Sequence, residues 1–233
     1  MNIDHTKDIA QKFGPMAALH DIAYRVANRL TDAMLLRGII LDLLTLNPDY
    51  LETEPPPDGV RWGFLGEAEL VPRARAGEAE LDLPFVEQAL AKGDLCYGVI
   101  DGGAGAGNGS GTLASYGWYS SRPTPVSEGL TLHFDPAYAY MYKGFTLPAY
   151  RGKRLHGIGM ARALEALEAL EVQGKKGLIS YVRSNNFASL KSCYRLGYCD
   201  FGQIVVARLN GRYVTYATKG CAEYAFRVEV DRD

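Results

Sequence analysis

The sequence Phe145-Thr-Leu-Pro-Ala-Tyr-Arg-Gly-Lys-Arg-Leu-His-Gly-Ile-Gly-Met160 decides the fold. Its residue types are typical of a strand, a sharp basic loop with glycine, and the first turns of a helix. Such a junction points backbone N–H groups and the positive end of a helix dipole at one spot, which suits a phosphate or pyrophosphate group. Three cations, Arg151, Lys153 and Arg154, lie in the same turn. The sequence therefore predicts a phosphorylated ligand at this loop.

The composition of the chain limits its class and its partners. Of 233 residues, 47% are hydrophobic and 22% are charged, which is typical of a soluble globular protein. The formal net charge is −2 and the pI is near 6.1. These values argue against a general nucleic-acid binder, because such proteins carry a broad basic excess. We therefore interpret the basic loop as a local feature and expect no nucleic-acid partner.

The cysteine pattern and the apolar stretches indicate a cytoplasmic location. The sequence contains the cysteines Cys96, Cys193, Cys199 and Cys221. They form no C-x-x-C pair and have no histidine at zinc-finger spacing, so we expect reduced thiols and no metal. The N-terminus lacks the basic region and apolar run of a signal peptide. The most apolar stretch, 34–46, is interrupted by Arg37 and Asp42 and is too short to span a bilayer, so no membrane partner is expected.

Residues 1–59 are expected to form an extension. Apolar residues recur at three- and four-residue intervals over 15–30 and a proline opens this stretch, which predicts an amphipathic helix packed on the core. The stretch 34–46 fits a buried strand or a helix, and periodicity alone leaves both open. The proline-rich segment 52–59 is typical of a stiff linker. We therefore expect the main domain at 60–233.

Beyond the linker, hydrophobic patterns and turn residues predict a mixed α/β (α+β) chain. Strands are expected at 60–65, 95–101, 112–121, 130–134, 138–147 and 177–182. Helices are expected at 66–75, 83–92, 157–170 and 186–196, with Asp82 and Asn186 as the N-caps of the second and the fourth. The glycine-rich run 102–111 is interpreted as a flexible loop. Asn210-Gly211 should join two strands in a hairpin. The strands 138–147 and 177–182, with a helix between them, should run parallel.

Two motifs, in this order, resemble the GNAT superfamily of acyl-CoA-dependent N-acetyltransferases. The pyrophosphate loop of that family follows a strand and reads R/Q-x-x-G-x-G/A, and a later helix reads roughly N-x-x-A/S-(x)7-G-F/Y. The first motif is similar to 148–156 of this chain. The second is matched in spacing by Asn186, Ser189, Gly197 and Tyr198. The resemblance covers 60–218 and implies a central mixed, mostly antiparallel sheet with one parallel splayed pair, flanked by helices, plus the N-terminal helical extension.

The loop fits the family motif in two registers. A start at Arg151 places Arg154 and His156 where the family usually has small residues. A start at Arg154 gives a literal match that ends at Gly159. We favour the Arg151 register, because in this family the residues equivalent to 148–153 abut the end of the strand. His156 would then bind a phosphate or cap the helix.

The resemblance implies transfer of an acetyl group from acetyl-CoA to a primary amine of a small molecule or a protein, by direct attack in a ternary complex. The thioester would lie where the two parallel strands splay apart. Backbone groups near Phe145 and Leu147 would bind the pantetheine arm, and one N–H would polarise the thioester carbonyl. The expected acetyl-CoA-binding residues are Phe145, Thr146, Leu147, Arg151, Gly152, Lys153, Arg154, Leu155, His156, Gly157 and Asn186.

The resemblance also suggests an acid for the CoA thiolate. The family often has a tyrosine seven residues after the motif asparagine, and that position is Cys193 here. Its neighbour Tyr194 is our catalytic candidate, with core packing beside Phe187 and Leu190 as the alternative. Cys193 is interpreted as a packed residue rather than a nucleophile, because no histidine lies near it in sequence.

Several residues are candidates for the base that takes the proton of the amine. Candidates on or before the strand at 138–147 are Tyr140, Tyr142, His133 and Glu128. Tyrosine is a poor base near neutral pH unless its pKa falls well below about 10. The sequence does not choose among the four, and we retain Tyr142 as a catalytic candidate.

Two other functions fit the same motifs. One is a long-chain N-acyltransferase that uses acyl-CoA or acyl carrier protein, with the apolar residues of 16–46 forming an acyl tunnel. The other is a non-catalytic acyl-CoA-binding regulatory module that keeps the fold and lacks a base. The N-terminal helix is also a candidate contact in a homodimer.

Overall fold

A computed structural model describes residues 3–51, 59–102, 111–169 and 174–231. The chain divides into two compact units, each built from separate segments of the sequence. The first unit combines residues 1–40, 123–135 and 180–233, and the second combines 41–122 and 136–179. Residues 52–58 of the expected linker and 103–110 of the glycine-rich run lie outside the described residues. The expected domain boundary after residue 59 stays a prediction.

Apart from the strand expected at 130–134, the second unit contains the strands that the sequence predicted before the basic loop. They are β2 (Val60–Leu65), β3 (Leu95–Asp101), β4 (Thr112–Ser120) and β7 (Ala139–Thr146), followed by the first residues of β8 (Leu178–Arg183). Neighbouring strands pair in the order β2-β3-β4-β7, all antiparallel. The strand β8 pairs with β7 in parallel, as predicted, and the ladder consists of Ala139–Leu178 and Tyr140–Ile179. The ladder therefore ends after Tyr140, and the rest of β7 pairs with β4.

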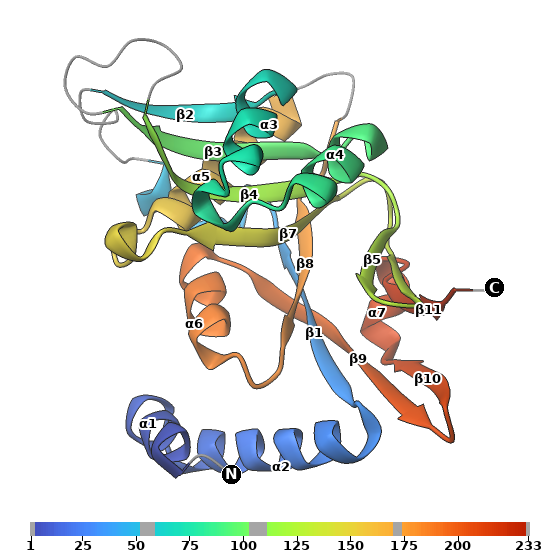
Figure 1. The fold of residues 1–233 in the computed structure, drawn as a ribbon. Coiled ribbons are helices and arrows are strands. Elements are labelled where there is room, and N and C mark those ends of the chain that lie inside the picture. Colours follow the sequence, from blue (N-terminus) through green and yellow to red (C-terminus); the bar gives the residue numbers. More distant parts are fainter. Residues whose placement is uncertain (1–2, 52–58, 103–110, 170–173, 232–233) are drawn as a thin grey trace. The chain divides into compact units, whose positions relative to one another are not determined.

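Helices cover the two faces of this sheet (Figure 1). They are α3 (Glu67–Arg75), α4 (Leu83–Lys92) and α5 (Leu155–Ala169), with short 3-10 turns at η1 (Pro48–Tyr50), η2 (Glu78–Glu80) and η3 (Pro148–Tyr150). The N-cap of α4 is Asp82, which accepts from the N–H of Phe85 at 3.1 Å as its sequence predicted. Alternate strand residues such as Cys96 and Trp118 join a core with α3 and α4. The strand residues that alternate with these point to the opposite face of the sheet, which α5 covers.

The first unit contains a second group of paired strands. These are β1 (Met34–Leu41), the later residues of β8, β9 (Cys199–Leu209) and β10 (Arg212–Ala217), in the order β10-β9-β1-β8. The hairpin of β9 and β10 turns at Asn210-Gly211, whose φ values are 51° and 79°. Two consecutive positive φ values are typical of the tight turn that the sequence predicted. The strand β1 resolves the choice between strand and helix for its part of 34–46.

Two N-terminal helices complete this part of the first unit. They are α1 (Ile3–Phe13), which the sequence did not predict, and α2 (Pro15–Thr31), which it did. The apolar stripe of α2 is exposed rather than packed on the core, as its large members Met16, Leu19, Val26 and Leu30 show. The buried residues of α2 are Ala18 and Asp21, and Asp21 lies 2.8 Å from Arg25. The expectation that the helix as a whole packs on the core stays a prediction.

The remaining elements of the first unit are a second sheet and two helices, of which the sequence patterns predicted the strand at 130–134 and the helix at 186–196 and missed the others. A three-stranded antiparallel sheet has the order β11-β6-β5. Its strands are β5 (Thr124–Ser127), β6 (Leu130–His133) and β11 (Arg227–Val230), and the helices are α6 (Phe187–Leu196) and α7 (Lys219–Glu223). The helix α6 was predicted, and it begins at the N-cap Asn186 and ends at left-handed Gly197.

The fold class follows from these elements. A mixed, mostly antiparallel sheet contains one parallel pair and is flanked by helices, with helices at the N-terminus. Across the described ranges, no helix is both long enough and apolar enough to cross a membrane.

Candidate functional site

The basic loop joins β7 to α5 within the second unit. Its residues 151–154 are all exposed, and they include the three cations that the sequence singled out. Gly152 has a φ of 81° and Arg154 a φ of 59°, so the backbone turns twice through the left-handed region. Arg151 Nε donates to the carbonyl of Thr146 at 3.2 Å. The loop therefore folds back onto the end of β7 and leaves its cations at the surface.

The start of α5 supplies backbone donors beside those cations. The first intrahelical bond runs from the N–H of Ile158 to the carbonyl of Arg154, at 3.0 Å. The N–H groups of Leu155, His156 and Gly157 precede this bond and belong to the unpaired first turn of a helix. The helix has 15 residues, so its dipole adds to the positive potential. Both loop registers thus direct an anion to the same amides.

The backbone of β7 changes the expected contacts to the pantetheine arm. The N–H of Leu147 donates to the carbonyl of Ala114 on β4 at 2.9 Å. Hydrogen-bonded and non-hydrogen-bonded pairs alternate along an antiparallel ladder, so Phe145 also directs its N–H toward β4. Thr146, between them, points its N–H away from β4. Of the three residues predicted to contact the pantetheine arm, Thr146 is therefore the one whose N–H is directed away from β4, and the contacts themselves stay a prediction.

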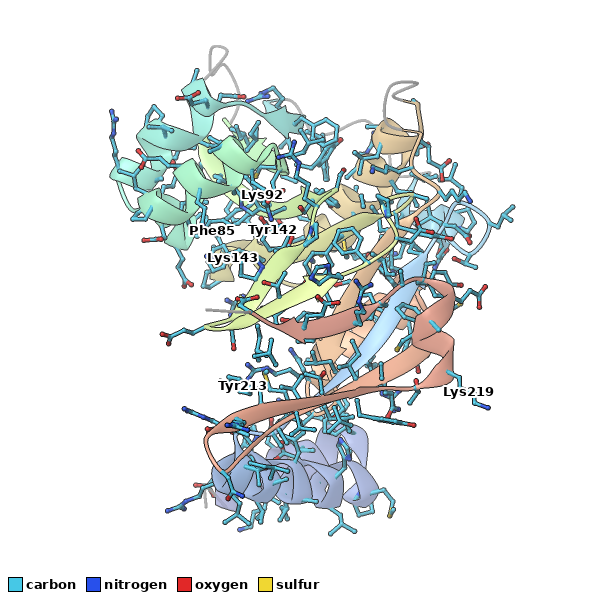
Figure 2. All side chains as sticks on the ribbon, turned by 90° about the vertical axis from the view of Figure 1, so that its right-hand side faces the viewer. Phe85, Lys92, Tyr142, Lys143, Tyr213 and Lys219 are labelled. Atoms are coloured by element: carbon cyan, nitrogen blue, oxygen red, sulfur yellow. The ribbon has the colours of Figure 1, made fainter. Side chains whose placement is uncertain are left out.

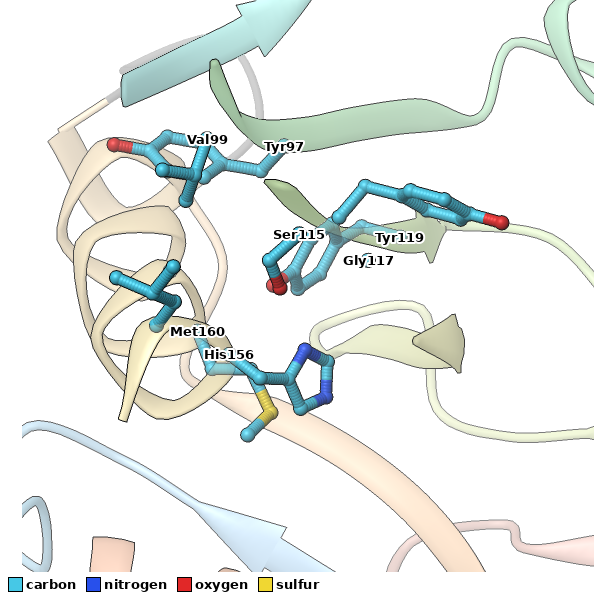
Figure 3. A pocket seen from close by; sticks show the side chains of 10 residues that line it. Tyr97, Val99, Ser115, Gly117, Tyr119, His156 and Met160 are labelled. Carbon is cyan, nitrogen blue, oxygen red and sulfur yellow. The ribbon is translucent and has the colours of Figure 1, made fainter. Parts of the chain in front are cut away.

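His156 packs against the sheet. Figure 3 shows its ring pointing from α5 toward β4, in a small pocket lined also by Ser115, Gly117 and Tyr119. Burial lowers the pKa of His156 to about 4, so the ring is neutral near pH 7. Its side chain therefore packs between α5 and the sheet. The part of His156 that is left to contact a phosphate is its backbone N–H.

Gly144 on β7 makes room for this ring. A Cβ atom built on Gly144 would overlap the imidazole of His156. The β4–β7 register shifts between Tyr116 and Trp118, and the adjacent Lys143 has a φ of 49°. The end of β7 therefore contains a bulge that requires glycine on the side of α5.

An aromatic cluster lies on the other face of β7, where Phe85, Lys92, Tyr142 and Lys143 gather (Figure 2). The Phe85 ring meets Tyr142 edge-on with centroids 6.1 Å apart, and Lys143 Nζ lies 3.5 Å from the Phe85 centroid. Burial lowers the pKa of Lys143. The Tyr142 hydroxyl donates to the buried carboxylate of Asp94. Burial, together with this bond, raises the pKa of Tyr142 well above its usual value, so Tyr142 is protonated at neutral pH.

Tyr194 lies in the first unit, on α6, in a polar cluster. Its hydroxyl donates to Asp200 Oδ1 at 2.9 Å and accepts from Arg37 Nη1 at 2.9 Å. The residue is 40% exposed, so core packing beside Phe187 and Leu190 does not describe it. Partial burial raises the pKa of Tyr194, and the bond to Asp200 acts in the same direction. The phenol is therefore a neutral donor, as an acid requires.

The other base candidates fall in both units. Tyr140 is a buried neighbour of Tyr142 on β7, with the two rings stacked 5.4 Å apart. His133 ends β6 in the first unit, 3.4 Å from Glu229, and Glu128 is exposed in the turn between β5 and β6. Of the four candidates, Tyr140 and Tyr142 therefore lie in the second unit, which also contains the basic loop.

Two further expectations concern α6. The side chain of Asn186 accepts from the N–H of Ser189 at 3.2 Å, which is the N-cap geometry expected for it. Burial raises the pKa of the Cys193 thiol to about 11. A thiol that stays protonated is a poor nucleophile, in agreement with its interpretation as a packed residue.

Sequence reasoning missed Asp94 and Lys92. Lys92 Nζ lies 2.9 Å from Asp94 Oδ2, and Asp94 is buried. The one local signal was a charged residue directly after Gly93, the left-handed residue that ends α4. Within the described part of the chain, no group of three or more His, Cys, Asp or Glu side chains is placed to hold a metal ion.

Comparisons with known proteins support the fold. No family model matches the sequence. No curated protein matches it. Among solved structures, a tandem GNAT protein from the clavulanic acid biosynthesis pathway is similar with a TM-score of 0.51, at 17% identity over 85% of this chain and 58% of that chain. At these values the likeness shows that this chain has the GNAT fold.

Other solved structures are less similar. A GNAT acetyltransferase described as putative, from Novosphingobium aromaticivorans, has a TM-score of 0.42 at 17% identity, over 86% of this chain and 66% of that one. Arabidopsis thaliana NAA60, solved in complex with acetyl-CoA, has a TM-score of 0.41 at 10% identity, over 73% and 98%. A Drosophila protein is matched over 59% of its chain. This chain thus spans less than two thirds of the Drosophila and tandem GNAT chains.

The contact between Gly144 and His156 gives a first prediction. Gly144→Ala should lower the free energy of unfolding by about 1–3 kcal/mol, because the added methyl group displaces the ring. In His156→Ala the methyl group has space, so the double variant should lose less than the sum of the two single variants, with a coupling of about 0.5–3 kcal/mol. Urea unfolding of the four proteins measures this cycle.

Gly63→Ala on β2 is the matched control, because a Cβ atom there meets nothing within 4 Å. It should leave the free energy of unfolding nearly unchanged. Additive losses in the Gly144 and His156 variants would contradict the contact.

Proposed function

We propose that this chain is an acetyl-CoA-dependent N-acetyltransferase whose acceptor is a primary amine of a small molecule or a protein. The observation that carries the proposal is the loop between β7 and α5. Three exposed cations and the unpaired amides of a helix start meet there at the end of a strand, within the GNAT fold. The negative charge of a pyrophosphate group that carries an acyl arm complements the positive charge of this loop.

The loop residues have separate parts in binding acetyl-CoA. The N–H groups of Leu155, His156 and Gly157 would donate to the pyrophosphate oxygens, and the positive end of the α5 dipole would favour its charge. The side chains of Arg151, Lys153 and Arg154 would neutralise its charge, because all three are exposed in the same loop. Gly152, with its positive φ, lets the loop turn back toward β7.

The end of β7 would position the thioester. The N–H of Thr146 points away from β4, and the parallel ladder with β8 already ends at Tyr140. A pantetheine arm could therefore add to this edge as an extended segment. A backbone N–H aimed at the thioester oxygen would stabilise the negative charge that develops during attack.

Direct transfer needs a neutral amine and a stabilised leaving group. The amine nitrogen attacks the carbonyl carbon, the C–S bond breaks, and the thiolate of CoA receives a proton. Tyr194, held as a neutral phenol by its surroundings, remains our candidate for that proton.

Ligand binding and turnover test this function in one experiment. Acetyl-CoA should raise the unfolding midpoint because it binds the folded chain, and palmitoyl-CoA should raise it less if the acyl site is short. Thiol release from acetyl-CoA across a panel of amines should then identify a productive acceptor. Arg151→Ala should reduce the acetyl-CoA shift, whereas Arg75→Ala, an exposed arginine of α3, should leave it unchanged.

The outcomes separate the candidate functions. A larger shift and faster thiol release with palmitoyl-CoA would favour long-chain transfer. A shift without thiol release for any amine would indicate a regulatory module. No shift with any CoA compound would contradict every CoA-based function.

A second prediction concerns Tyr194. Tyr194→Phe should lower kcat by about 10²-fold or more, with little change in KM for acetyl-CoA, because the lost hydroxyl acts on the leaving group. The same kinetics on Tyr213→Phe, a tyrosine of β10, supply a control for hydroxyl removal. An unchanged kcat in Tyr194→Phe would show that this phenol is not the acid.

A further inference from the structure

Asp94 is a buried charged residue at the turn between α4 and β3. Only 3% of the residue is exposed. Its N–H donates to the carbonyl of Ala89 at 2.9 Å, directly after the left-handed residue Gly93. The backbone therefore fixes the place of the carboxylate. Burial of a charge is costly unless the charge is paired and hydrogen-bonded, so the partners of this carboxylate indicate its purpose.

The two carboxylate oxygens of Asp94 differ in their hydrogen-bond and ion-pair partners. Oδ2 lies 2.9 Å from Lys92 Nζ and accepts the hydroxyl proton of Tyr142 in a hydrogen bond. Oδ1 is also buried and accepts no hydrogen bond from any residue that the structure describes. An ion pair with a purely structural purpose is most stable when both oxygens are satisfied. In Asp94 only Oδ2 is paired, and because the Tyr142 hydroxyl donates to it, Oδ2 is the oxygen that can take the proton of the phenol.

Tyr142 connects this buried carboxylate to the surface of β7. Tyr142 is only partly buried, and the next residues, Lys143 and Gly144, are exposed. Its ring is held by stacking on Tyr140 at 5.4 Å. Because the pKa of Tyr142 is raised, the phenol does not ionise at neutral pH. It can release its proton to Asp94 only as its oxygen receives another.

We propose that Tyr142 and Asp94 form a proton relay for the acceptor amine, in which Asp94 is the terminal base. This inference rests on the proposed N-acetyltransferase function. As the nitrogen lone pair forms a bond to the thioester carbon, an N–H proton moves to the Tyr142 oxygen and the Tyr142 proton moves to Asp94. The carbonyl re-forms as the C–S bond breaks, and the electron pair of that bond leaves on sulfur. Asp94 then returns its proton to solvent along the same path.

Lys92 is the charged partner of Asp94. The ammonium of Lys92, at the end of α4, lies 2.9 Å from Asp94 Oδ2 and 5.4 Å from the centre of the Tyr142 ring. Burial keeps the pKa of the Cys96 thiol on β3 high, so this thiol adds no charge. Trp118 on β4 faces Tyr142 across the ladder. Lys92 is therefore the cation that compensates the buried carboxylate.

Kinetics of thiol release with a productive amine test the relay. Asp94→Asn and Tyr142→Phe should each lower kcat/KM by about 10²–10⁴-fold. The double variant should lose no more than the worse single variant, because both residues act on one proton. Controls are Asp82→Asn, which removes a carboxylate while keeping an N-cap for α4, and Tyr97→Phe, which removes a phenol on the α5 side of β3. Both should retain kcat/KM.

Acetyl-CoA thermal shifts of each variant separate folding and binding from turnover. The relay is wrong if Asp94→Asn and Tyr142→Phe bind acetyl-CoA and keep the wild-type kcat/KM. If Asp94→Asn does not fold, the kcat/KM of Tyr142→Phe decides whether the relay is right. If the wild-type chain binds acetyl-CoA but acetylates no amine, the proposed function fails and the relay is overturned with it.

Discussion

The missing side chain at Gly144 allows α5 to start against the end of β7, and the rest of the site depends on this contact. His156 in the first turn of the helix occupies the space that a Cβ atom on Gly144 would fill. This packing fixes where the first amides of α5 lie relative to Thr146. Because Arg151 also bonds to Thr146, the cationic loop is tied to the same strand end. A larger residue at Gly144 would separate the anion site from the thioester site.

Charge is divided between the two faces of β7. The exposed cations of the loop lie at the start of α5, although the chain carries a net charge of −2. The buried carboxylate of Asp94 lies on the face covered by α4, where Tyr142 reaches it. In the proposed function, the loop would bind the anionic part of acetyl-CoA and Asp94 would accept a proton, so the two proposed roles use different charges.

Local signals in the sequence predicted most elements of the fold. Asp82 and Asn186 cap the helices expected for them, and Asn210-Gly211 forms the expected turn. These signals act within a few residues, so the sequence alone reveals them. Periodicity also predicted that α2 is amphipathic. Periodicity does not show which side of this helix is covered, and in the structure its large apolar residues are exposed.

Contacts between distant segments were not predictable in the same way. Asp94 and Tyr142 are far apart in sequence, and they meet because β3, β4 and β7 pair in a particular order and register. The same register turned the N–H of Thr146, rather than that of Leu147, away from β4. A one-residue change in register would reverse both results. The loop motif is therefore a local signal for the proposed acetyl-CoA site, whereas the strand register determines which backbone and side-chain groups lie beside it.

The most direct test of the account compares two acetyl thioesters by isothermal titration calorimetry. Acetyl-CoA carries the pyrophosphate that the β7–α5 loop is proposed to bind, and S-acetylpantetheine has the same reactive arm without it. The account predicts measurable binding of acetyl-CoA and binding of S-acetylpantetheine that is at least about 10²-fold weaker, a difference of about 2.7 kcal/mol. Equal affinities, or no binding of acetyl-CoA, would contradict it.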